Sequence, residues 1–347
     1  MEIHYGNPFR GESLEKLRLF LLEQEIFYDE QTDFSVCLME GSLIAAAGSL
    51  GANVLKCIAV APAYQNEGLA ACVVSELIHE AARRDLYHLF VFTRPENREL
   101  FASLGFFSVA ETEKALLMEN KKDGIAVFVS GLKAESSNHT GSRKGPVNTS
   151  NGITGAIVAN CNPFTNGHLY LIETAASQCD MVHVFILSEN KSEFPAELRR
   201  ELVAGGTAHI PNVVVHSTGP YLISAATFPD YFLKGNSPEE EKGELDLTIF
   251  AERIAGPLKI TRRYVGTEPY SPVTAAYNRQ MKEILPRFGI EVIEIPRLEI
   301  ADVESGVSLA VSASEVRSLM MEGKLKLVEA LVPAVTYEYL RKYDKQS

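Results

Sequence analysis

Two spacings of apolar residues divide the N-terminal part of this chain into predicted strands and helices. Between residues 37 and 51, two short apolar runs are joined by Glu40-Gly41, a pattern that predicts a β-hairpin. From Gly68 to Asp85 the apolar residues recur every three to four positions, which predicts an amphipathic helix. The other elements expected here are strands at 54–62, 88–94, 115–118 and 125–128 and a short helix at 96–105.

From residue 153 onward, predicted strands and helices alternate. Strands are expected at 153–160, 181–188, 212–218, 260–268 and 290–299, and helices from His168, over 195–209 and 274–289, and from Ser314. Alternation at this rhythm is typical of a parallel sheet with helices on both faces. In such sheets ligands bind at the carboxyl ends of the strands, near a switch in strand order. We therefore predict an α/β fold class.

One change in composition suggests a domain boundary. Residues 133–152 are rich in Ser, Asn, Gly and Lys and contain almost no large apolar residues. This composition is typical of a flexible linker. We expect an N-terminal domain at 1–132, a linker at 133–152 and a second domain at 153–347.

Composition places the chain among ordinary globular proteins, with 46% hydrophobic and 22% charged residues. No apolar run approaches the roughly 20 residues of a membrane span, and the N-terminus lacks the pattern of a signal peptide. The five cysteines form no CxxC pair. We expect a cytoplasmic protein with reduced thiols, no membrane association and no metal held by a protein site.

The formal net charge of −12 argues against broad nucleic-acid binding, which needs a basic surface. A single nucleotide is a different case, because a few backbone amides and cationic side chains suffice to hold a triphosphate. A small phosphorylated ligand therefore stays open.

The stretch Thr165-Asn166-Gly167-His168 lies at the first strand-to-helix turn of the second domain. The free N–H groups of a helix N-terminus attract an anion. Gly167 lets a ligand approach the backbone closely, and His168 is a candidate donor to a phosphate oxygen. The alternative is an ordinary helix capped by Thr165, with His168 exposed.

A second stretch, VSASEVR at 311–317, again places small hydroxyl residues before a helix. Ser312 and Ser314 are candidate caps, and Arg317 follows Ser314 by about one turn. Its fork-shaped cation suits phosphate. The alternative is an ordinary helix cap with a solvated arginine.

Together, in this order, the two stretches resemble the [HT]-x-G-H and I-S-x-[ST]-x-x-R motifs of the nucleotidyltransferase superfamily, with Val311 in place of Ile. The resemblance implies a Rossmann-like domain that binds ATP and stabilises charge on its α-phosphate, with His168, Thr165 and Arg317 as catalytic residues. Lys191 and Arg199 are further candidate cations, and the stretch from Gly266 is where the superfamily contacts the nucleoside. The nucleotide-binding residues expected are Asn162, Phe164, Gly167, Lys191, Arg199, Gly266, Glu268, Ser312 and Ser314. An aromatic stretch at 221–234 is a candidate wall for a small acyl pocket.

In the first domain, residues 65–70, QNEGLA, join a predicted strand to a helix N-terminus whose amides are suited to a pyrophosphate. This stretch and residues 97–106 resemble the two signatures of the GNAT acetyltransferases. The resemblance implies an α+β domain that binds a pantetheine-type arm. The residues expected to contact the arm are Val60, Gln65, Gly68, Ala70 and Asn97.

One position departs from the GNAT pattern. Many members of that family carry a tyrosine four residues before the glycine of the second signature, where it protonates the leaving thiolate. This chain has Phe101 there, which has no proton to give. We therefore expect the domain to bind an arm, while its catalysis of acetyl transfer is in doubt; a domain that only packs is the alternative.

A GNAT-like half followed by a nucleotidyltransferase half is a rare arrangement, and it resembles the acetate:citrate lyase ligase family over nearly the whole chain. The resemblance implies ATP and Mg²⁺ as cofactors, acetate as substrate and the thiol form of the citrate lyase acyl carrier subunit as partner. Acetate would be activated as acetyl-adenylate, and the thiol of a dephospho-CoA-derived arm would displace AMP. Two alternatives stay open: an adenylyltransferase acting on a phosphorylated small molecule, and a non-catalytic docking protein that senses ATP.

Overall fold

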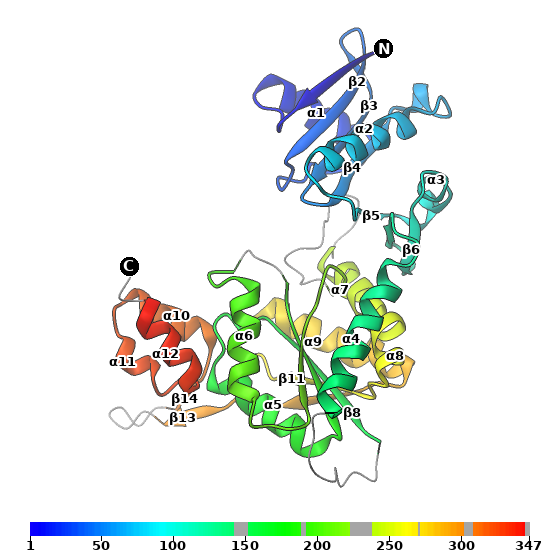
Figure 1. Ribbon diagram of the computed structural model, residues 1–347. Coiled ribbons are helices and arrows are strands. Elements are labelled where there is room, and N and C mark those ends of the chain that lie inside the picture. Colours follow the sequence, from blue (N-terminus) through cyan, green and yellow to red (C-terminus); the bar gives the residue numbers. More distant parts are fainter. Residues whose placement is uncertain (142–151, 189–191, 223–237, 270, 302–307, 344–347) are drawn as a thin grey trace. The chain divides into compact units, whose positions relative to one another are not determined.

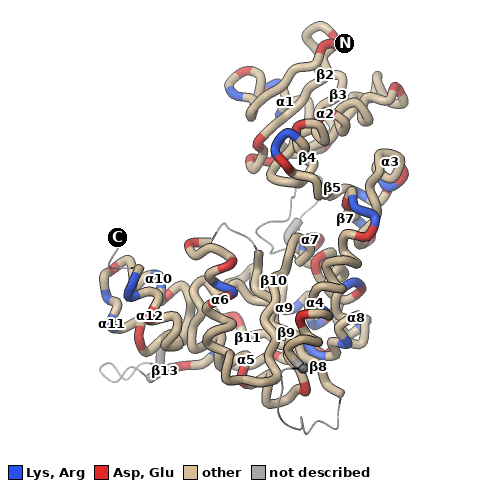
Figure 2. Tube along the Cα trace, in the orientation of Figure 1, with Lys and Arg blue, Asp and Glu red and all other residues tan. Residues whose placement is uncertain are grey.

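The computed structural model describes residues 1–141, 152–188, 192–222, 238–269, 271–301 and 308–343 (Figure 1). The chain folds into two compact units: unit 1 is Met1–Ile125 with Thr227–Thr248, and unit 2 is Ala126–Ala226 with Ile249–Ser347. The predicted aromatic stretch at 221–234 falls mostly outside the described residues. In both units acidic and basic residues are interspersed along the chain (Figure 2).

Unit 1 is built on a seven-stranded sheet of order β1-β2-β3-β4-β5-β7-β6, in which only the β4–β5 pair is parallel. The strands are β1 (Glu2–Gly6), β2 (Phe34–Glu40), β3 (Leu43–Gly51), β4 (Val54–Val60), β5 (Phe90–Thr93), β6 (Phe107–Glu111) and β7 (Leu116–Glu119). Its helices are α1 (Glu12–Glu23), α2 (Leu69–Arg83), α3 (Arg98–Ser103) and, near the end of its second segment, most of α7 (Pro238–Ile249).

Helix α2 covers the middle of this sheet. Its buried residues Val73, Leu77 and Ala81 lie four apart, as the apolar spacing predicted, and they pack into the core formed with strands β2 to β5. The predicted hairpin is confirmed as β2 and β3, joined through Gly41 at a positive φ of 60°.

Strand β4 separates from β5 partway along its length. The two strands pair only at Val54 with Phe90 and at Leu55 with Val91. Just beyond, Cys57 has a positive φ of 51° and the pairing with β3 shifts register, as at a β-bulge. Because a bulge bends a strand, it accounts for the gap between β4 and β5.

The prediction of a strand at 125–128 is wrong. The strand expected at 125–128 and the first part of the expected linker belong to one helix, α4 (Gly124–Gly141). Ser130 and Ser136 donate their hydroxyl protons to the backbone carbonyls four residues earlier, so these polar residues satisfy themselves within the helix. The rest of the expected linker, 142–151, lies outside the described residues.

Unit 2 contains a five-stranded parallel sheet of order β10-β9-β8-β11-β12, which confirms the predicted α/β domain (Figure 1). The strands are β8 (Thr154–Ala159), β9 (Met181–Ile186), β10 (Val213–Ser217), β11 (Arg262–Gly266) and β12 (Glu291–Ile295). The chain first runs outward from β8 to β10 and then returns to the other side of β8 with β11. The switch in strand order therefore falls between β8 and β11.

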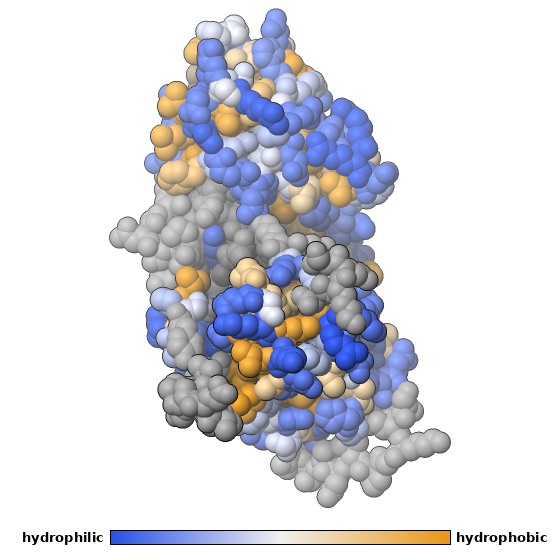
Figure 3. All heavy atoms as spheres, turned by 90° about the vertical axis from the view of Figure 1, so that its left-hand side faces the viewer, coloured by the Kyte–Doolittle hydropathy of each residue, from blue (hydrophilic) through white to orange (hydrophobic). Residues whose placement is uncertain are grey.

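Helices connect these strands and extend the domain at its C-terminus. They are α5 (Asn166–Gln178), α6 (Ala196–Thr207), the π-helix Phe250–Ala255, α8 (Gly256–Leu258), α9 (Pro272–Ile284), α10 (Ala313–Met321), α11 (Leu325–Val328) and α12 (Ala334–Tyr343), with a small hairpin of β13 (Glu299–Ala301) and β14 (Ser308–Ala310). Figure 3 looks onto the side that carries α10 to α12 and shows apolar side chains gathered among hydrophilic ones. Within the described ranges, no helix is long and apolar enough to cross a membrane.

Candidate active site

The two predicted motifs of unit 2 lie against each other at the carboxyl-end side of the parallel sheet. Arg317 of α10 donates a hydrogen bond to the backbone carbonyl of Asn162, in the loop between β8 and α5. A Cβ atom added to Gly167 would lie 2.9 Å from the carbonyl oxygen of Val311. The sequence suggested that Gly167 leaves room for a ligand; the structure shows that it lets the first turn of α5 approach the segment before α10.

The hydrogen bonds of His168 fix which of its ring nitrogens carries the proton. Nδ1 accepts from the backbone N–H of Thr165 at 3.1 Å and lies 2.8 Å from the Thr165 hydroxyl oxygen. In the same capping box, Thr165 Oγ1 accepts from the His168 backbone N–H. Since Nδ1 is an acceptor, a neutral His168 carries its proton on Nε2, where it is available as a donor.

Thr165 therefore contacts the edge of the His168 ring that carries Nδ1. The residue is only 1% exposed and it caps α5, as the alternative interpretation of the motif expected. His168 is only partly exposed, and the ring of Phe164, which is fully buried, stacks 6.2 Å from its own. Thr165 and Phe164 thus hold the imidazole in place rather than facing open space.

Burial, and then the positive charge of Arg297, lower the pKa of His168 to about 4. The imidazole is therefore neutral near pH 7. A neutral donor that is already oriented can hydrogen-bond an oxyanion without first acquiring a proton.

Arg297 is a site residue that the motifs did not predict. It follows β12 and donates from Nε to the Thr267 carbonyl at 2.9 Å, while its guanidinium also binds the Glu268 carboxylate. The other oxygen of Glu268 accepts from the backbone N–H of Ser271, the N-cap of α9. Arg297 thereby ties the loop after β11 to the end of β12; its place just after a parallel strand was the signal that could have found it.

Gly266 ends β11 at this same loop. Space is open around the position of an added Cβ, and its carbonyl accepts from the Asn278 amide at 3.0 Å. Glu268, expected to contact a nucleoside, has its carboxylate engaged by Arg297 and Ser271. The loop is thus fixed, with Gly266 as its open point.

Arg199 of α6 holds two loops together. It is fully buried, and its guanidinium donates to the carbonyl of Phe194 at 3.0 Å and to that of Asn160 at 2.7 Å. The Asn162 side-chain oxygen accepts from the backbone N–H of Phe194 at 3.1 Å, so the same two loops are joined twice. Lys191, the other predicted cation of this stretch, lies outside the described residues.

The start of α10 is organised around Arg317. Ser312 is the N-cap and accepts from the Glu315 backbone N–H at 3.1 Å, while Arg317 donates to Ser314 Oγ at 3.2 Å. Glu193 lies 3.8 Å from the Arg317 Nε. Ser314 and Arg317 are therefore aligned on one side of the first turn of α10.

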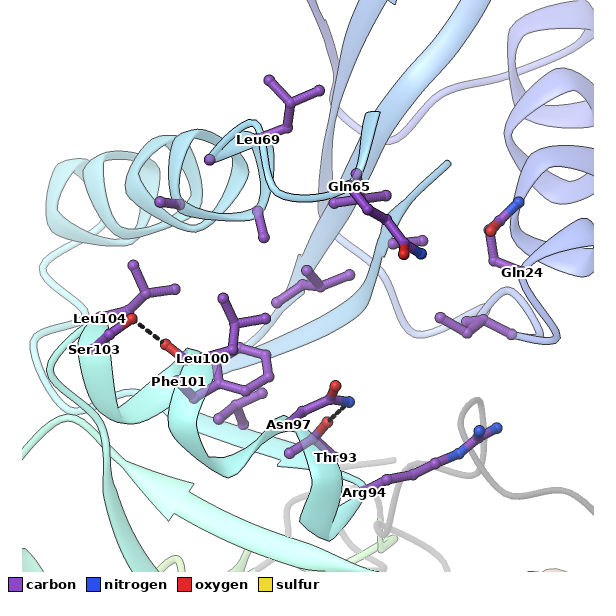
Figure 4. Close-up of a pocket in the computed structure, with 18 of the residues that line it drawn as sticks. Gln24, Gln65, Leu69, Thr93, Arg94, Asn97, Leu100, Phe101, Ser103 and Leu104 are labelled. Atoms are coloured by element: carbon purple, nitrogen blue, oxygen red, sulfur yellow. Dashed lines mark hydrogen bonds between the residues drawn. The ribbon is translucent and has the colours of Figure 1, made fainter. Parts of the chain in front are cut away.

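Unit 1 contains a pocket of about 840 Å³ where β4 and β5 separate (Figure 4). All five residues predicted to contact an arm line it: Val60, Gln65, Gly68, Ala70 and Asn97. Space is open at Gly68, which precedes α2 at a φ of 77°. The structure thus brings together residues that lie as far apart in the sequence as the two GNAT-like stretches.

Phe101 lines one side of this pocket and is 3% exposed, packed edge-on against Phe106 at 6.1 Å. Figure 4 places Phe101 with Leu100 and Leu104 at an apolar side of the pocket, while Asn97 donates to Thr93 at 2.9 Å below it. Of the described residues that line the pocket, none is Asp, Glu, His, Cys or Lys. The lining of this pocket therefore offers few groups for proton transfer.

Comparison with known proteins agrees with both halves. Residues 154–340 match the model of the citrate lyase ligase C-terminal domain, and residues 10–117 match that of an acetyltransferase (GNAT) domain. The chain is 37% identical to the citrate (pro-3S)-lyase ligase of Escherichia coli (strain K12), over 95% of this chain and 91% of the relative. The chain belongs to the citrate lyase ligase family.

A second family member, the citrate (pro-3S)-lyase ligase of Klebsiella pneumoniae, is also 37% identical, over 94% of this chain and 92% of its own. The relatives are ligases, so this member of the citrate lyase ligase family is an enzyme. The structure of Thermotoga maritima TmcAL bound with alpha-thio ATP is 14% identical over 56% of each chain, with a TM-score of 0.39, too low a likeness to support an inference.

Proposed function

We propose that this ligase activates acetate with ATP in unit 2 and passes the acetyl group to a thiol of the citrate lyase acyl carrier subunit. A carboxylate oxygen of acetate attacks the α-phosphorus, and the bond from that phosphorus to the bridging oxygen breaks to release pyrophosphate. The thiol sulfur then attacks the acyl carbon of acetyl-adenylate, the bond from that carbon to the bridging phosphate oxygen breaks, AMP leaves with this oxygen, and the thiol proton passes to solvent.

The observation that carries the proposal is the tautomer of His168. With Nδ1 accepting from Thr165, the Nε2–H is directed away from the cap and has no acceptor among the described residues. A donor held in this way stabilises the extra negative charge that builds on the α-phosphate as the fifth oxygen approaches. Thr165 positions that donor.

Arg317 supplies the second interaction, with the β- and γ-phosphates. Its guanidinium lies over the first turn of α10, beside Ser314, where backbone N–H groups also point outward. The hydrogen bond to the Asn162 carbonyl holds this cation beside the loop that leads to His168. Charge on the departing pyrophosphate would therefore be balanced while His168 acts on the α-phosphate.

Among the described residues, no group of three or more His, Cys, Asp or Glu side chains lies together as a cation cage would require. Mg²⁺ would therefore bind together with the triphosphate, through phosphate oxygens and water, and would neutralise part of the charge of the nucleotide. The chain's part is then to bind the phosphates through Arg317, the Ser312 cap and the amides of α5.

Unit 1 is proposed to hold the pantetheine-type arm that carries the thiol. Beyond Leu55, β4 and β5 are not paired with each other, and the pocket lies between them, which suits an extended arm that enters as a peptide joins a sheet edge. The α2 N-terminus at Gly68 and Ala70 suits its phosphates. With Phe101 at the apolar side, the arm is bound there without acetyl transfer.

The experiment that tests the function is exchange of labelled pyrophosphate into ATP, with Mg²⁺ present, with and without acetate. The expected result is exchange that requires acetate in the native enzyme and is lost in His168→Ala. Exchange without acetate would point to another acceptor and contradict the proposal. A parallel assay also contains the thiol protein. Exchange that appears only in that assay would mean that the thiol protein must bind before acetate is activated.

A further inference from the structure

The segment just before α6 brings a carboxylate to the candidate site of unit 2. Glu193 is exposed, and one of its carboxylate oxygens lies 3.8 Å from Nε of Arg317. That separation is too long for a hydrogen bond, and no described residue donates one to this carboxylate. Arg317 directs its hydrogen bonds to the Asn162 carbonyl and to Ser314 instead. Glu193 therefore offsets part of the Arg317 charge without taking one of its hydrogen bonds.

The backbone on both sides of Glu193 is fastened to the loop after β8. Asn160 donates from its side-chain amide to the hydroxyl oxygen of Ser192 at 3.2 Å. The backbone N–H of Phe194 donates to the side-chain oxygen of Asn162 at 3.1 Å, and Phe194 itself is only 1% exposed. Because the segment is held at these points, we expect the Glu193 carboxylate to stay beside Arg317 when a ligand arrives.

A carboxylate in this place acts differently on the two forms of ATP. The complex with Mg²⁺ carries two negative charges fewer than free ATP, because the ion is divalent and binds to the phosphate oxygens. The proposed function places the β- and γ-phosphates at Arg317, so Glu193 lies next to them. It repels the free triphosphate strongly and the magnesium complex much less, because the repulsion scales with the charge it faces.

We propose that Glu193 makes nucleotide binding in unit 2 depend on Mg²⁺. The charge of Arg317 alone would attract a triphosphate with or without the ion. Glu193 cancels much of that attraction for free ATP, and the site therefore selects the magnesium form. The inference rests on the proposed function, and it adds the residue that chooses between the two forms of the nucleotide.

The test is calorimetric binding of ATP to the full chain without acetate, once with excess Mg²⁺ and once with EDTA. The measured quantity is the ratio of the two dissociation constants, free ATP over the magnesium complex. In Glu193→Gln, whose amide keeps the shape and removes the charge, this ratio is expected to fall roughly 5-fold, mainly because free ATP binds more tightly. High salt should reduce the ratio of the native protein, because the carboxylate is exposed and therefore screened.

The ratio separates this role from a structural one. If Glu193 only held Arg317 in position, its loss would change both dissociation constants by the same factor and leave the ratio unchanged. Arg317→Gln should weaken the binding of both forms; unaltered affinities in that variant would place the nucleotide elsewhere and overturn the inference.

Glu197→Gln is the matched control. Glu197 lies in the first turn of α6, is exposed, and is paired with Arg200 at 2.5 Å, so its substitution should leave the ratio as it is in the native protein. An unchanged ratio in Glu193→Gln, or an equal fall in Glu197→Gln, would overturn the inference and leave the activation of acetate to be judged by pyrophosphate exchange. If neither form of ATP binds to the native chain, both the inference and the proposed function fail.

Discussion

The candidate site of unit 2 and the pocket of unit 1 use opposite chemical means. In unit 2, every central side chain has a fixed polar partner: Thr165 sets the tautomer of His168, Asn162 holds Arg317, and Glu268 holds Arg297. Preorganised donors of this kind are what a reaction that develops charge requires. The chemistry therefore belongs where the polar groups are constrained.

The pocket of unit 1 lies between two strands instead, and its lining is mostly apolar or neutral, with Arg94 as the charged residue among the described ones. Where a GNAT enzyme commonly has a tyrosine, this pocket has the buried Phe101. A GNAT-like fold therefore need not perform the GNAT reaction. Here the gap between the strands is present, but the usual proton donor is not. On the proposed function, one unit would make the reactive acyl group and the other would present the acceptor.

The substitution His168→Ala should have the largest effect on turnover, and it tests whether the chemistry lies in unit 2. Removing one transition-state donor is expected to lower kcat by roughly 100-fold or more, with a smaller effect on the KM for ATP. Turnover is measured beside His209→Ala, an exposed histidine of unit 2 paired only loosely with Glu173 at 3.4 Å, which should behave as the native enzyme. Near-normal turnover in His168→Ala would show that the reaction does not take place at this site.

Arg317→Lys tests the fork of the guanidinium rather than its charge. Lysine keeps one positive charge but cannot reach Asn162, Ser314 and phosphate oxygens together. We expect kcat/KM for ATP to fall about 10-fold, in line with the loss of one charge-assisted hydrogen bond. Unchanged steady-state kinetics would show that Arg317 only fastens α10 to the loop before α5.

Acid should destabilise unit 2 through its buried neutral histidines. Burial, and then the charge of the neighbouring His216, lower the pKa of His183 to about 3, and its ring bonds to His216 at 2.9 Å. The unfolded chain takes up protons first, near pH 6.5, so stability is full above that pH and is lost as the pH falls toward 3. His168, with its pKa of about 4, acts in the same direction.

Between about pH 7.5 and about pH 5 the loss of stability due to His183 is on the order of 2 kcal/mol, because stability changes by about 1.4 kcal/mol per pH unit below about pH 6.5. Urea unfolding at about pH 7.5 and about pH 5 measures it, and His183→Gln, whose amide does not titrate, should flatten the dependence. An equally steep loss of stability in that variant would assign the acid sensitivity to other groups.

Gly167→Ala tests whether the two motifs of unit 2 pack closely against each other. A methyl group 2.9 Å from the Val311 carbonyl forces the two motifs apart, and we expect a loss of about 1–2 kcal/mol together with lower activity. Gly131→Ala is the control, because nothing lies within 4 Å of its added Cβ in α4, and there alanine should stabilise by about 0.5–1 kcal/mol. Equal effects of the two variants on unfolding would argue against a close approach at Gly167.

The smallest effect is expected from Phe101→Tyr. The new hydroxyl restores a proton donor but no base stands among the described lining residues, so acetyl transfer from acetyl-CoA to an amine should stay undetectable. Ligase turnover should change by less than about 2-fold, since the ring keeps its place against Phe106. Measurable acetyl transfer in either protein would mean that unit 1 is itself catalytic.

Much of the fold could be predicted because its elements have clear periods. The alternation after residue 153 predicted the parallel sheet, and the spacing of Val73, Leu77 and Ala81 predicted α2. Helix α4 could not be predicted from composition, because Ser130 and Ser136 satisfy their hydroxyls within the helix and so reverse the usual preference of serine for turns. Strand β6 was missed for a related reason: its residues Phe107 and Ser108 are exposed and give no clean alternation.

The site divides in the same way. His168 and Arg317 lie in local motifs, and a local motif can be found in one sequence. Arg297 acts through Thr267 and Glu268, about 30 residues away along the chain, and only the pairing of β11 with β12 brings them together. The burial of Arg199 likewise depends on two loops that no spacing rule connects.

The most direct test of the account is acetate-dependent pyrophosphate exchange in Ala70→Trp, assayed beside His168→Ala. The indole is placed to fill the unit 1 pocket at the start of α2, far in sequence from any residue of the proposed chemistry. The account predicts exchange within about 2-fold of the native enzyme in Ala70→Trp and at least about a 100-fold loss in His168→Ala. Exchange that is lost in Ala70→Trp, or kept in His168→Ala, would contradict the division of binding and chemistry between the two units.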